Sequence, residues 1–432
     1  MPRPPRTSTA NLSANSAAAT TGPDNRPPLP SGWKWATLGE VCELRTGTRD
    51  HGQSPDAPFL YVDISSVDNK RKRITEAKRL LGKVAPSRAR QVIKTGDVLV
   101  ATTRPNLNAV ALVPPEFNDQ IASTGFCVLR NTVEVLPEFL FSFVQTPAFV
   151  EALSDLVKGA LYPAVTDKQV QGQPIPLPPL AEQRRIVAGL RERLDAVERA
   201  RAATAAQLAD ANALPAACLR ELFTSPEAQQ WPVKRLDAVG EIAAGITLGK
   251  KRTGTETLRS IPYLRVANVK DGRLDLSNVY NVEATPAEIA KCLLRPGDIL
   301  LTEGGDPDKL GRGTFWQGQI PECIHQNHIF RVRFDQEHFS PEFLSWQFGS
   351  IYGKTYFLKH AKQTTGIASI NQQVLSAFPL LVPPLATQRR IAAELKGKLA
   401  GAEALRSSLA AQLADLDALP TAYLRQAFAG EF

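Results

Sequence analysis

No stretch of the sequence is apolar enough to cross a membrane. No uncharged apolar run approaches the ~18 residues that a spanning helix requires. The first 23 residues, MPRPPRTSTANLSANSAAATTGP, lack the apolar block of a signal peptide. We therefore expect the protein to be cytoplasmic.

Cysteine is scarce, with five residues in 432 and no pair at the CxxC spacing. Zinc ribbons and disulfide frameworks are built from closely spaced cysteine pairs, so neither is expected. Cys323, His325 and His328 form the only dense group of metal-capable side chains, and no second pair completes four ligands. We expect reduced and mostly buried thiols at Cys42, Cys127, Cys218, Cys292 and Cys323.

Motifs that bind nucleotide or methyl-donor cofactors are missing. Residues 245–251, GITLGKK, resemble a phosphate-binding loop, but only three residues separate the glycines and no Ser or Thr follows the lysine to bind magnesium. There is no GxGxxG after a predicted strand and no Asn-Pro-Pro-aromatic tetrad of amino-methyltransferases. Asp306 and Asp308 lie in a glycine-rich loop, which favours solvation over a nuclease site. We therefore expect neither a cofactor nor catalytic residues in this chain.

Length and charge allow a multidomain protein with a polyanionic partner. With 432 residues, 43% hydrophobic and 22% charged, the chain has the composition of two or three globular units. Lysine and arginine exceed aspartate and glutamate by 51 to 43. The net charge of +8 is compatible with nucleic-acid binding but does not require it.

The sequence contains a duplicated pattern. Residues 178–186 read PPLAEQRRI, and residues 383–391 read PPLATQRRI, 205 positions later. Residues 205–223 and 410–428 match at the same offset, so no insertion or deletion is needed between the two matched segments. The segments ahead of these blocks repeat more weakly, at offsets that drift from 198 to 204. The order is therefore variable unit, constant block, variable unit, constant block.

Each constant block has the periodicity of a long helix. Apolar or small side chains recur at alternating steps of three and four, which is typical of a coiled-coil seam. Arg201 and Arg406 occupy the same seam position in the two blocks. Pro215 and Pro420 also match, and we expect them to interrupt the helices. The other seam residues are Val187, Leu190, Leu194, Val197, Thr204, Leu208 and Ala211, then Ala392, Leu395, Leu399, Ala402, Leu409, Leu413 and Leu416.

The two seams most simply bury each other. An antiparallel pair would carry the variable units to opposite ends, related by a pseudo-twofold axis. In the alternative arrangement, each helix packs on the variable unit before it. The unbroken offset of 205 favours the pair, since equal helix lengths matter most where the helices set a separation.

The variable units, residues 31–175 and 226–380, have the pattern of mixed α/β domains of the α+β class. Short helices are predicted near 137–156 and 340–359. Residues 1–30 are rich in Pro, Ser, Thr and Ala and are predicted to be a disordered tail. The predicted strands are Pro58–Ile64, Asp97–Thr102, Thr124–Leu129, Ile261–Val266, Asp298–Thr302 and His328–Val332.

Basic residues gather early in each variable unit. Ten basic residues and a single acid, Glu76, lie between Lys70 and Lys94, and the second unit has a more diluted cluster. Such runs are either solvated surface or contacts to DNA phosphates. The phosphate-contact candidates are Lys70, Arg71, Lys72 and Arg73 in the first unit and Lys250, Lys251 and Arg252 in the second.

Sequence would be read at base edges by amide, guanidinium, amine and carboxylate groups on loops. The candidates are Asn69, Arg104, Asn106 and Asn108 in the first unit, and Asn268, Glu303, Asp306, Lys309, Arg312, Gln326 and Asn327 in the second.

This succession of variable units and PPLxxQRRI helices resembles the specificity subunits of type I restriction-modification systems. The resemblance covers residues 31–432, and Pro178–Ile186 is similar to that family's proline-proline-leucine-x-glutamate-glutamine signature. The second copy departs from it at Thr387, where the family usually has glutamate. The resemblance implies target recognition domains at 31–175 and 226–380 and constant helices at 176–225 and 381–432.

In such proteins each target recognition domain reads one half of a bipartite, asymmetric site in double-stranded DNA. The constant helices fix the spacer and dock methyltransferase subunits, expected here to be two. S-adenosylmethionine, ATP and Mg²⁺ would belong to those subunits and to the restriction/translocase subunits, so the resemblance implies a non-catalytic DNA-binding subunit. The residues that would serve the coiled coil and docking are Leu190, Leu194, Val197, Leu208, Leu395, Leu399, Leu409 and Leu413.

Two other functions remain open at this point. The chain could be the recognition subunit of a fused restriction-methylation enzyme of the type IIB or IIG kind. It could instead be a coiled-coil scaffold whose lateral domains bind protein rather than DNA. A steep dependence of DNA binding on salt would argue against the scaffold.

Overall fold

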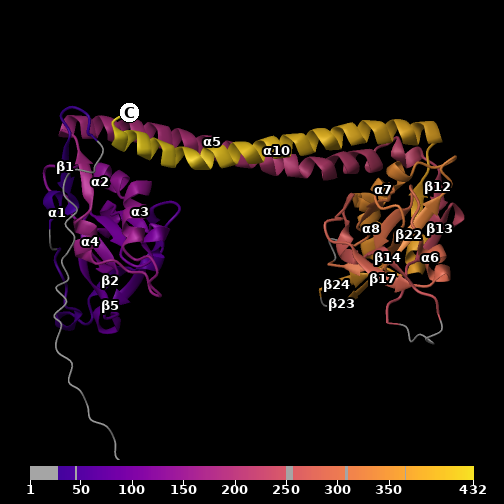
Figure 1. Cartoon of the computed structure of the whole chain (residues 1–432), viewed down its shortest axis with the longest axis horizontal. Coiled ribbons are helices and arrows are strands. Elements are labelled where there is room, and N and C mark those ends of the chain that lie inside the picture. The colour runs from indigo at the N-terminus through magenta and orange to yellow at the C-terminus, as the bar shows by residue number, and fades with distance from the viewer. Residues whose placement is uncertain (1–27, 44–45, 250–255, 307–309, 365) are drawn as a thin grey trace, which may run out of the picture. The chain divides into compact units, whose positions relative to one another are not determined.

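The computed structural model describes residues 28–43, 46–249, 256–306, 310–364 and 366–432. They form two compact units (Figure 1). Unit 1 combines the residues up to 200 with 416–432, and unit 2 comprises residues 201–415. No helix in the described part of the chain is long and apolar enough to span a membrane.

Both constant blocks fold as single long helices, as the seam predicted. Helix α5 runs Leu180–Thr224 and helix α10 runs Leu385–Ala429, 45 residues each. The prediction that Pro215 and Pro420 interrupt these helices is wrong, because both prolines lie inside them. A proline in a helix interior removes a backbone hydrogen bond and costs about 3 kcal/mol. The turns beyond each proline must therefore be stabilised by packing.

That packing comes from phenylalanines at the helix ends. In unit 1, the ring of Phe428 lies 4.9 Å from that of Phe139 and 5.5 Å from that of Phe143. In unit 2, the ring of Phe223 lies 5.7 Å from that of Phe343. Full burial of such a side chain is worth roughly 1.5–3 kcal/mol. Because Phe223 is buried beyond Pro215, and Leu424 and Ala427 are buried beyond Pro420, each helix continues through its proline.

Each unit contains the start of one long helix and the end of the other. In unit 1, Ile186 and Leu190 of α5 share an apolar cluster with Ala427 of α10. In unit 2, Ile391 of α10 shares a cluster with Phe223 of α5. A start packed against an end is the predicted antiparallel arrangement, and Figure 1 shows the C-terminus beside the beginning of α5. The alternative is partly right as well, since the first turns of each helix also pack on the domain before it.

The predicted seam is the buried side of both helices. Leu190, Val197, Leu395 and Leu409 are buried, and Leu194, Leu208, Leu399 and Leu413 are half-buried. Arg201 and Arg406 interrupt the seam, because both are exposed. Four of the five cysteines are buried and Cys218 is half-buried, in agreement with the expectation of mostly buried thiols.

Unit 1 contains the predicted mixture of short strands and helices. A four-stranded sheet has the order β5-β2-β9-β6, and a three-stranded sheet has the order β10-β7-β8. All pairs are antiparallel except β2 with β9. The strands are β1 Lys34–Thr37, β2 Pro58–Val62, β3 Val67–Asp68, β4 Arg73–Ile74, β5 Lys78–Leu81, β6 Ala89–Ile93, β7 Val98–Ala101, β8 Val110–Leu112, β9 Gln120–Ser123, β10 Phe126–Leu129 and β11 Pro174–Leu177. The helices ahead of α5 are α1 Leu38–Val41, α2 Pro137–Phe143, α3 Pro147–Asp155 and α4 Asp167–Gln171.

Unit 2 repeats this topology with additions. The parallel pair β2 and β9 recurs as β14 and β21, and strands β18, β20 and β22 take the places of β7, β8 and β10. The strands are β12 Val233–Arg235, β13 Gly240–Ala244, β14 Arg259–Leu264, β15 Val269–Lys270, β16 Arg273–Leu274, β17 Tyr280–Ala284, β18 Ile299–Thr302, β19 Gly304–Gly305, β20 Gly313–Phe315, β21 Ile324–His325, β22 Ile329–Phe334, β23 Lys362–Thr364, β24 Ile367–Ser369 and β25 Pro379–Leu381. The helices besides α10 are α6 Pro286–Cys292, α7 Pro341–Gly349, α8 Ile351–His360 and α9 Gln372–Ser376. All six predicted strands are present, with ends displaced by at most two residues.

A buried ion pair recurs in both units and explains part of the weaker repeat. Asp97 and Asp298 are each 1% exposed and precede the matching strands β7 and β18. In unit 1, Nε and Nη2 of Arg130 donate to the two oxygens of Asp97 at 2.9 and 2.8 Å. Arg333 donates to Asp298 at 2.6 Å through both groups. These residues therefore hold the sheets and are not free for a ligand.

The glutamine of the PPLxxQRRI motif anchors each long helix to its domain. Gln183 is buried, accepts a hydrogen bond from the backbone nitrogen of Leu136 at 2.8 Å and donates to the carbonyls of Glu134 and Pro178. Gln388 is buried too and forms matching bonds with Ser340 and Pro383. The motif thus fixes where each helix leaves its domain.

Candidate nucleic-acid interface

In unit 1 two loops bring most of the predicted DNA-binding residues together. The β3–β4 turn carries Asn69 to Lys72, and the β7–β8 loop carries Arg104 to Asn108. The Nζ atom of Lys72 donates to the main-chain oxygen of Asn108 at 2.6 Å. The side-chain amide of Asn69 donates to the main-chain oxygen of Leu107 at 3.4 Å. Residues 36 and 38 positions apart in the sequence therefore form one surface.

The backbone of this surface is held in an uncommon conformation. Lys72, Arg104 and Asn108 have φ angles of 54°, 51° and 45°, in the left-handed region. Non-glycine residues adopt this region rarely, and such positions cluster at functional sites. Burial lowers the pKa of Lys72 to about 8.

The surface is strongly basic. Lys70, Arg71, Arg73 and Arg104 are exposed. Arg71 has one long ion pair with Asp68, at 3.9 Å, and the other three have no ion pair among the described residues. Asp68 accepts hydrogen bonds from the backbone nitrogens of Lys70 and Arg71, which lowers the pKa of its carboxyl and closes the turn. The unpaired cations are free to meet phosphates.

A third loop, between α3 and α4, joins the same surface, and the sequence did not indicate it. The backbone nitrogen of Arg104 donates to the carbonyl of Pro163 at 2.8 Å, and Thr103 forms a β-bridge with Ala164. Leu161 and Tyr162 on this loop are 88% and 86% exposed. Two adjacent, fully exposed apolar side chains in a Gly- and Pro-containing loop are the signal that could have drawn attention to it.

Unit 2 brings the three corresponding loops together. In the β15–β16 turn, the backbone nitrogen of Gly272 donates a hydrogen bond to the carbonyl of Gly313, at the start of β20. In the β18–β20 loop, Gly304 of β19 is paired with Ser369 of β24 in an antiparallel ladder. The backbone nitrogen of Ile370 donates to the carbonyl of Glu303 at 2.8 Å. The same three connections thus meet in both units.

Several predicted readers of unit 2 lie near this junction. Nδ1 of His328 and a carboxylate oxygen of Glu303 are 2.6 Å apart. Gln326 and Asn327 are half-buried beside His328 in the turn between β21 and β22. Arg312 is half-buried at the start of β20, and its Nε has no hydrogen-bond partner among the described residues.

Other candidates are placed differently. Asn268 is 3% exposed, accepts a hydrogen bond from the backbone nitrogen of Arg265 and donates to the carbonyls of Asp275 and Asn278. The side-chain amide of Asn268 closes a turn and has no free atom for a base edge. The prediction that Asn268 reads a base is therefore wrong. In unit 1, Asn106 is exposed on the 3₁₀ turn η5, Pro105–Leu107. Asp306 is exposed in the loop between β19 and β20, and the remaining candidates, Lys250, Lys251, Arg252 and Lys309, lie outside the described residues.

Sequence reasoning missed an arginine that the structure places next to Gln326. The guanidinium carbon of Arg265 lies 3.8 Å from the ring centroid of Tyr280, and its buried Nε has no hydrogen-bond partner within the described chain. A guanidinium stacked on an aromatic ring is a preorganised fork for phosphate or a base edge. The corresponding pair in unit 1 is Asp63 and Lys78, which are 2.5 Å apart. The two units therefore differ in charge at one equivalent position.

The metal-capable group near residue 325 is used for other contacts. Burial raises the pKa of Cys323 to about 12 and lowers the pKa of His325 to about 4. His325 bonds through Nδ1 to the carbonyl of Ile329, and His328 bonds to Glu303. Among the described residues, no three His, Cys, Asp or Glu side chains gather as metal ligands.

Comparison with known proteins identifies the family. A family model described as "Type I restriction modification DNA specificity domain" matches residues 30–204 and 228–401. The chain belongs to this family. Each matched segment begins just ahead of β1 or β12 and ends within a long helix, so the family's repeat consists of a domain and the start of its helix.

Solved structures and curated relatives agree with this membership. The HsdS subunit from Thermoanaerobacter tengcongensis is 33% identical, with a TM-score of 0.70 and coverage of 94% of this specificity chain and 99% of that one. A chain from a study of complex assembly and conformational transition of the type I R-M system is also 33% identical, with a TM-score of 0.75 and coverage of 94% and 100%. The EcoKI specificity subunit of Escherichia coli K12 is 24% identical over 356 residues, which are 79% of this chain and 76% of the relative.

Proposed function

We propose that this specificity chain directs a type I restriction-modification complex to a bipartite site in double-stranded DNA, with one half-site for each unit. The observation that carries the proposal is the convergence of the same three loops in both units, around different side chains. A shared scaffold with unlike loops is what two readers of unlike half-sites require.

The side chains divide into two roles. Lys70, Arg71 and Arg73 project from a turn and are suited to phosphate contacts, which position the protein without reading sequence. Arg104, Asn106 and the Gln326–Asn327 turn carry guanidinium and amide groups that fit base edges. The proposed mechanism is therefore electrostatic capture followed by readout in the groove.

Catalysis would come from partner polypeptides. The EcoKI relative is named as a specificity subunit of a restriction enzyme, and one similar structure was solved in a study of complex assembly. We infer that two modification subunits and the restriction/translocase subunits supply S-adenosylmethionine, ATP and Mg²⁺ chemistry, while this chain supplies recognition. The exposed sides of α5 and α10 are the surfaces available for docking.

A salt titration of DNA binding tests the proposal. The chain is co-purified with its modification subunits, and the triple variant Lys70→Ala, Arg71→Ala and Arg73→Ala is compared with wild type. Removing three phosphate contacts should lower the slope of log affinity against log salt by roughly 0.9 for each contact. The matched triple variant Lys234→Ala, Arg235→Ala and Lys291→Ala, exposed elsewhere in unit 2, should leave the slope unchanged. A shallow, unaltered slope for all three proteins would favour the scaffold function instead.

A fused restriction-methylation enzyme predicts a different partner. In that case one polypeptide joins nuclease and methylase, whereas the type I function requires a separate helicase-nuclease chain. The relatives named above are subunits of type I enzymes, which favours the type I function.

A further inference from the structure

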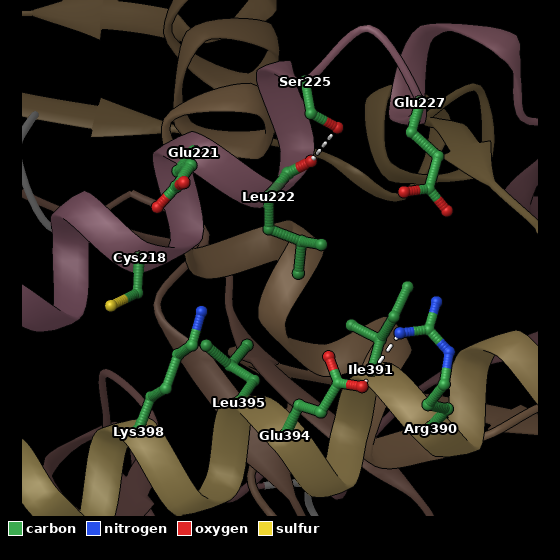
Figure 2. A pocket seen from close by; sticks show the side chains of 10 residues that line it. All are labelled: Cys218, Glu221, Leu222, Ser225, Glu227, Arg390, Ile391, Glu394, Leu395 and Lys398. Atoms are coloured by element: carbon green, nitrogen blue, oxygen red, sulfur yellow. Dashed lines mark hydrogen bonds and ion pairs between the residues drawn. The ribbon is translucent and has the colours of Figure 1, made fainter.

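A groove in unit 2 lies between the end of α5 and the start of α10 (Figure 2). Its cavity volume is about 210 Å³. Leu222 of α5 points toward Ile391 and Leu395 of α10, so the floor of the groove is apolar. The lining residues are Cys218, Glu221, Leu222, Ser225, Glu227, Arg390, Ile391, Glu394, Leu395 and Lys398.

Aromatic rings of the chain itself line the equivalent groove in unit 1. Every lining residue has a counterpart 205 positions away, and the counterparts of Glu227 and Lys398 are Phe432 and Arg193. The guanidinium carbon of Arg193 lies 3.9 Å from the ring centroid of Phe432 and 5.4 Å from that of Tyr423. These distances are typical of cation–π stacking.

A glycine makes room for this ring. A Cβ atom on Gly189 would lie 2.7 Å from the ring of Phe432, so a larger residue at this position would displace it. The counterpart of Gly189 in unit 2 is Glu394, whose carboxylate accepts a hydrogen bond from Arg390 at 2.9 Å. Unit 1 is therefore built around an aromatic side chain that unit 2 does not supply.

Unit 2 keeps the cation but lacks both rings. Cys218 stands where unit 1 has Tyr423, and Glu227 stands where it has Phe432. Lys398 occupies the place of Arg193 and has no ion pair among the described residues. The groove floor and the cation that would hold a ring are both present, and the ring is not.

The rim of the groove is acidic. Glu221 and Glu227 are exposed, and neither forms an ion pair with any residue that the structure describes. The third carboxylate, Glu394, is neutralised by Arg390. An occupant with a positive charge beside its ring would therefore be complementary to the groove.

We infer that this groove docks an aromatic side chain of a partner polypeptide, together with a lysine or arginine next to that side chain. The ring packs on the apolar floor beside Lys398, displaced from the position that Phe432 takes in unit 1 because Glu394 replaces Gly189, and the flanking cation pairs with Glu221 or Glu227. The inference rests on the proposed function, which supplies the partner as the modification subunit of the complex. It adds the contact by which unit 2, unlike unit 1, binds that partner.

The native thiol of Cys218 reports on the groove directly. It is half-buried, whereas the other four cysteines are buried, and burial raises the pKa of Cys42 and Cys323 to about 12. Alkylation of the native chain by iodoacetamide should therefore occur first at Cys218. Assembly with the modification subunit should slow this alkylation at least tenfold. A maleimide photo-crosslinker on Cys218 should then capture a partner segment that contains an aromatic residue with an adjacent lysine or arginine.

A variant that closes the groove completes the test. Glu227→Phe removes a rim carboxylate and adds a ring at the groove, so it should lower the affinity of the chain for the modification subunit at least tenfold. The matched control is Glu337→Phe, which adds the same ring at an exposed turn of unit 2 outside the groove. The control should bind the partner like wild type.

The outcomes separate this inference from the proposed function. Sedimentation of the mixture shows whether a complex forms. If a complex forms but Cys218 is alkylated as fast as in the isolated chain, or Glu227→Phe binds the partner like wild type, the inference about the groove is wrong and the proposed function stands. A crosslinked partner segment without an aromatic residue would also contradict the inference about the groove. The absence of any complex overturns the partner assignment of the proposed function and, with it, the groove.

Discussion

At the scale of single residues, the repeat keeps the side chains that hold each domain and varies those at the loop junction. The pair of Asp97 with Arg130 recurs in unit 2 with the same bidentate geometry. At the loops the chemistry changes instead. Lys72 stands at the left-handed position of its turn, and the corresponding turn of unit 2 has Gly272 there, with φ of 70°. The left-handed residue ahead of the second strand is thus shared, while the charge and the length of the turn are not.

The left-handed lysine gives a prediction with a built-in control. Lys72→Ala and Lys72→Gly remove the same charge, so both should weaken DNA binding by the same severalfold factor. Only glycine adopts φ of 54° without steric cost, so Lys72→Gly should be more stable than Lys72→Ala by about 1 kcal/mol. DNA retention and urea unfolding measure the two effects. Equal stabilities would show that the turn is not strained.

The lowered pKa of Lys72 also predicts a pH dependence. Below its pKa of about 8 the amine is charged and attracts phosphate, and above it the charge is lost. DNA affinity should therefore fall as pH rises through about 8, with the midpoint moved upward by bound phosphate. The Lys72→Gly variant should show a smaller fall over the same range. Identical pH profiles for the two proteins would contradict this.

The stacked arginine of unit 2 predicts an effect on specificity. Arg265→Lys keeps the charge but loses the planar fork, so nonspecific affinity should persist while the preferred base at one position loses roughly 1–3 kcal/mol of discrimination. Selection from DNA with one randomised half-site measures this. In unit 1, Lys78→Met breaks the pair with Asp63 and should leave the half-site of unit 2 unchanged. Loss of affinity for all sequences would instead make Arg265 a phosphate contact.

At the scale of elements, the buried glutamine of the repeated motif decides how firmly each long helix is fixed to its domain. Gln183 satisfies a backbone nitrogen and two carbonyls at the start of α5. Gln183→Leu has a similar volume but leaves these groups unpaired, at about 1–3 kcal/mol each. The transition of unit 1 in urea should therefore move to lower concentration. Gln207→Ala, on the exposed side of α5, should shift it by no more than about 0.5 kcal/mol. An unchanged transition for Gln183→Leu would show that contacts other than those of Gln183 fix the start of α5.

The long helices were predictable from the sequence because their signal is local. The seam from Leu190 to Leu208 repeats every three or four residues, and that spacing alone defines a helical face. The passage of α5 through Pro215 was not predictable, because it depends on the burial of Phe223 against Phe343, more than a hundred residues away. Local propensity opposed the helix and tertiary packing decided it.

The candidate interface was only partly predictable for the same reason. The basic run beginning at Lys70 is visible in the sequence, but its junction with Asn108 depends on the pairing of β7 with β8. The stacking of Arg265 on Tyr280 follows from the register of β14 and β17, which places Tyr263 opposite Tyr280. Asn268 looked like a loop amide available for a base, and its turn buries it.

At the scale of the whole molecule, neither unit is a continuous stretch of chain. Unit 1 includes residues 416–432, and its core contains Leu424 and Ala427 from the end of α10. Unit 2 in turn contains the second half of α5, with Phe223 in its core. A cut between the two variable domains would therefore remove core residues from a unit. The equal lengths of α5 and α10 follow from the need to complete both units at once.

This mutual completion sharpens the expectation that the helices set the DNA spacer. Seven residues inserted into both helices, after Ala200 in α5 and after Asp415 in α10, preserve the seam and both unit cores, since the insertions fall at the boundary between units. Each helix lengthens by about 10.5 Å, or roughly three base pairs. Sequencing of methylated DNA from cells with the altered chain should show the same two half-sites with a spacer about three base pairs longer, or no methylation. An insertion into α5 alone shifts its seam against an unaltered partner and should abolish methylation. The original spacer, found with both insertions in place, would mean that the helices do not determine the spacing.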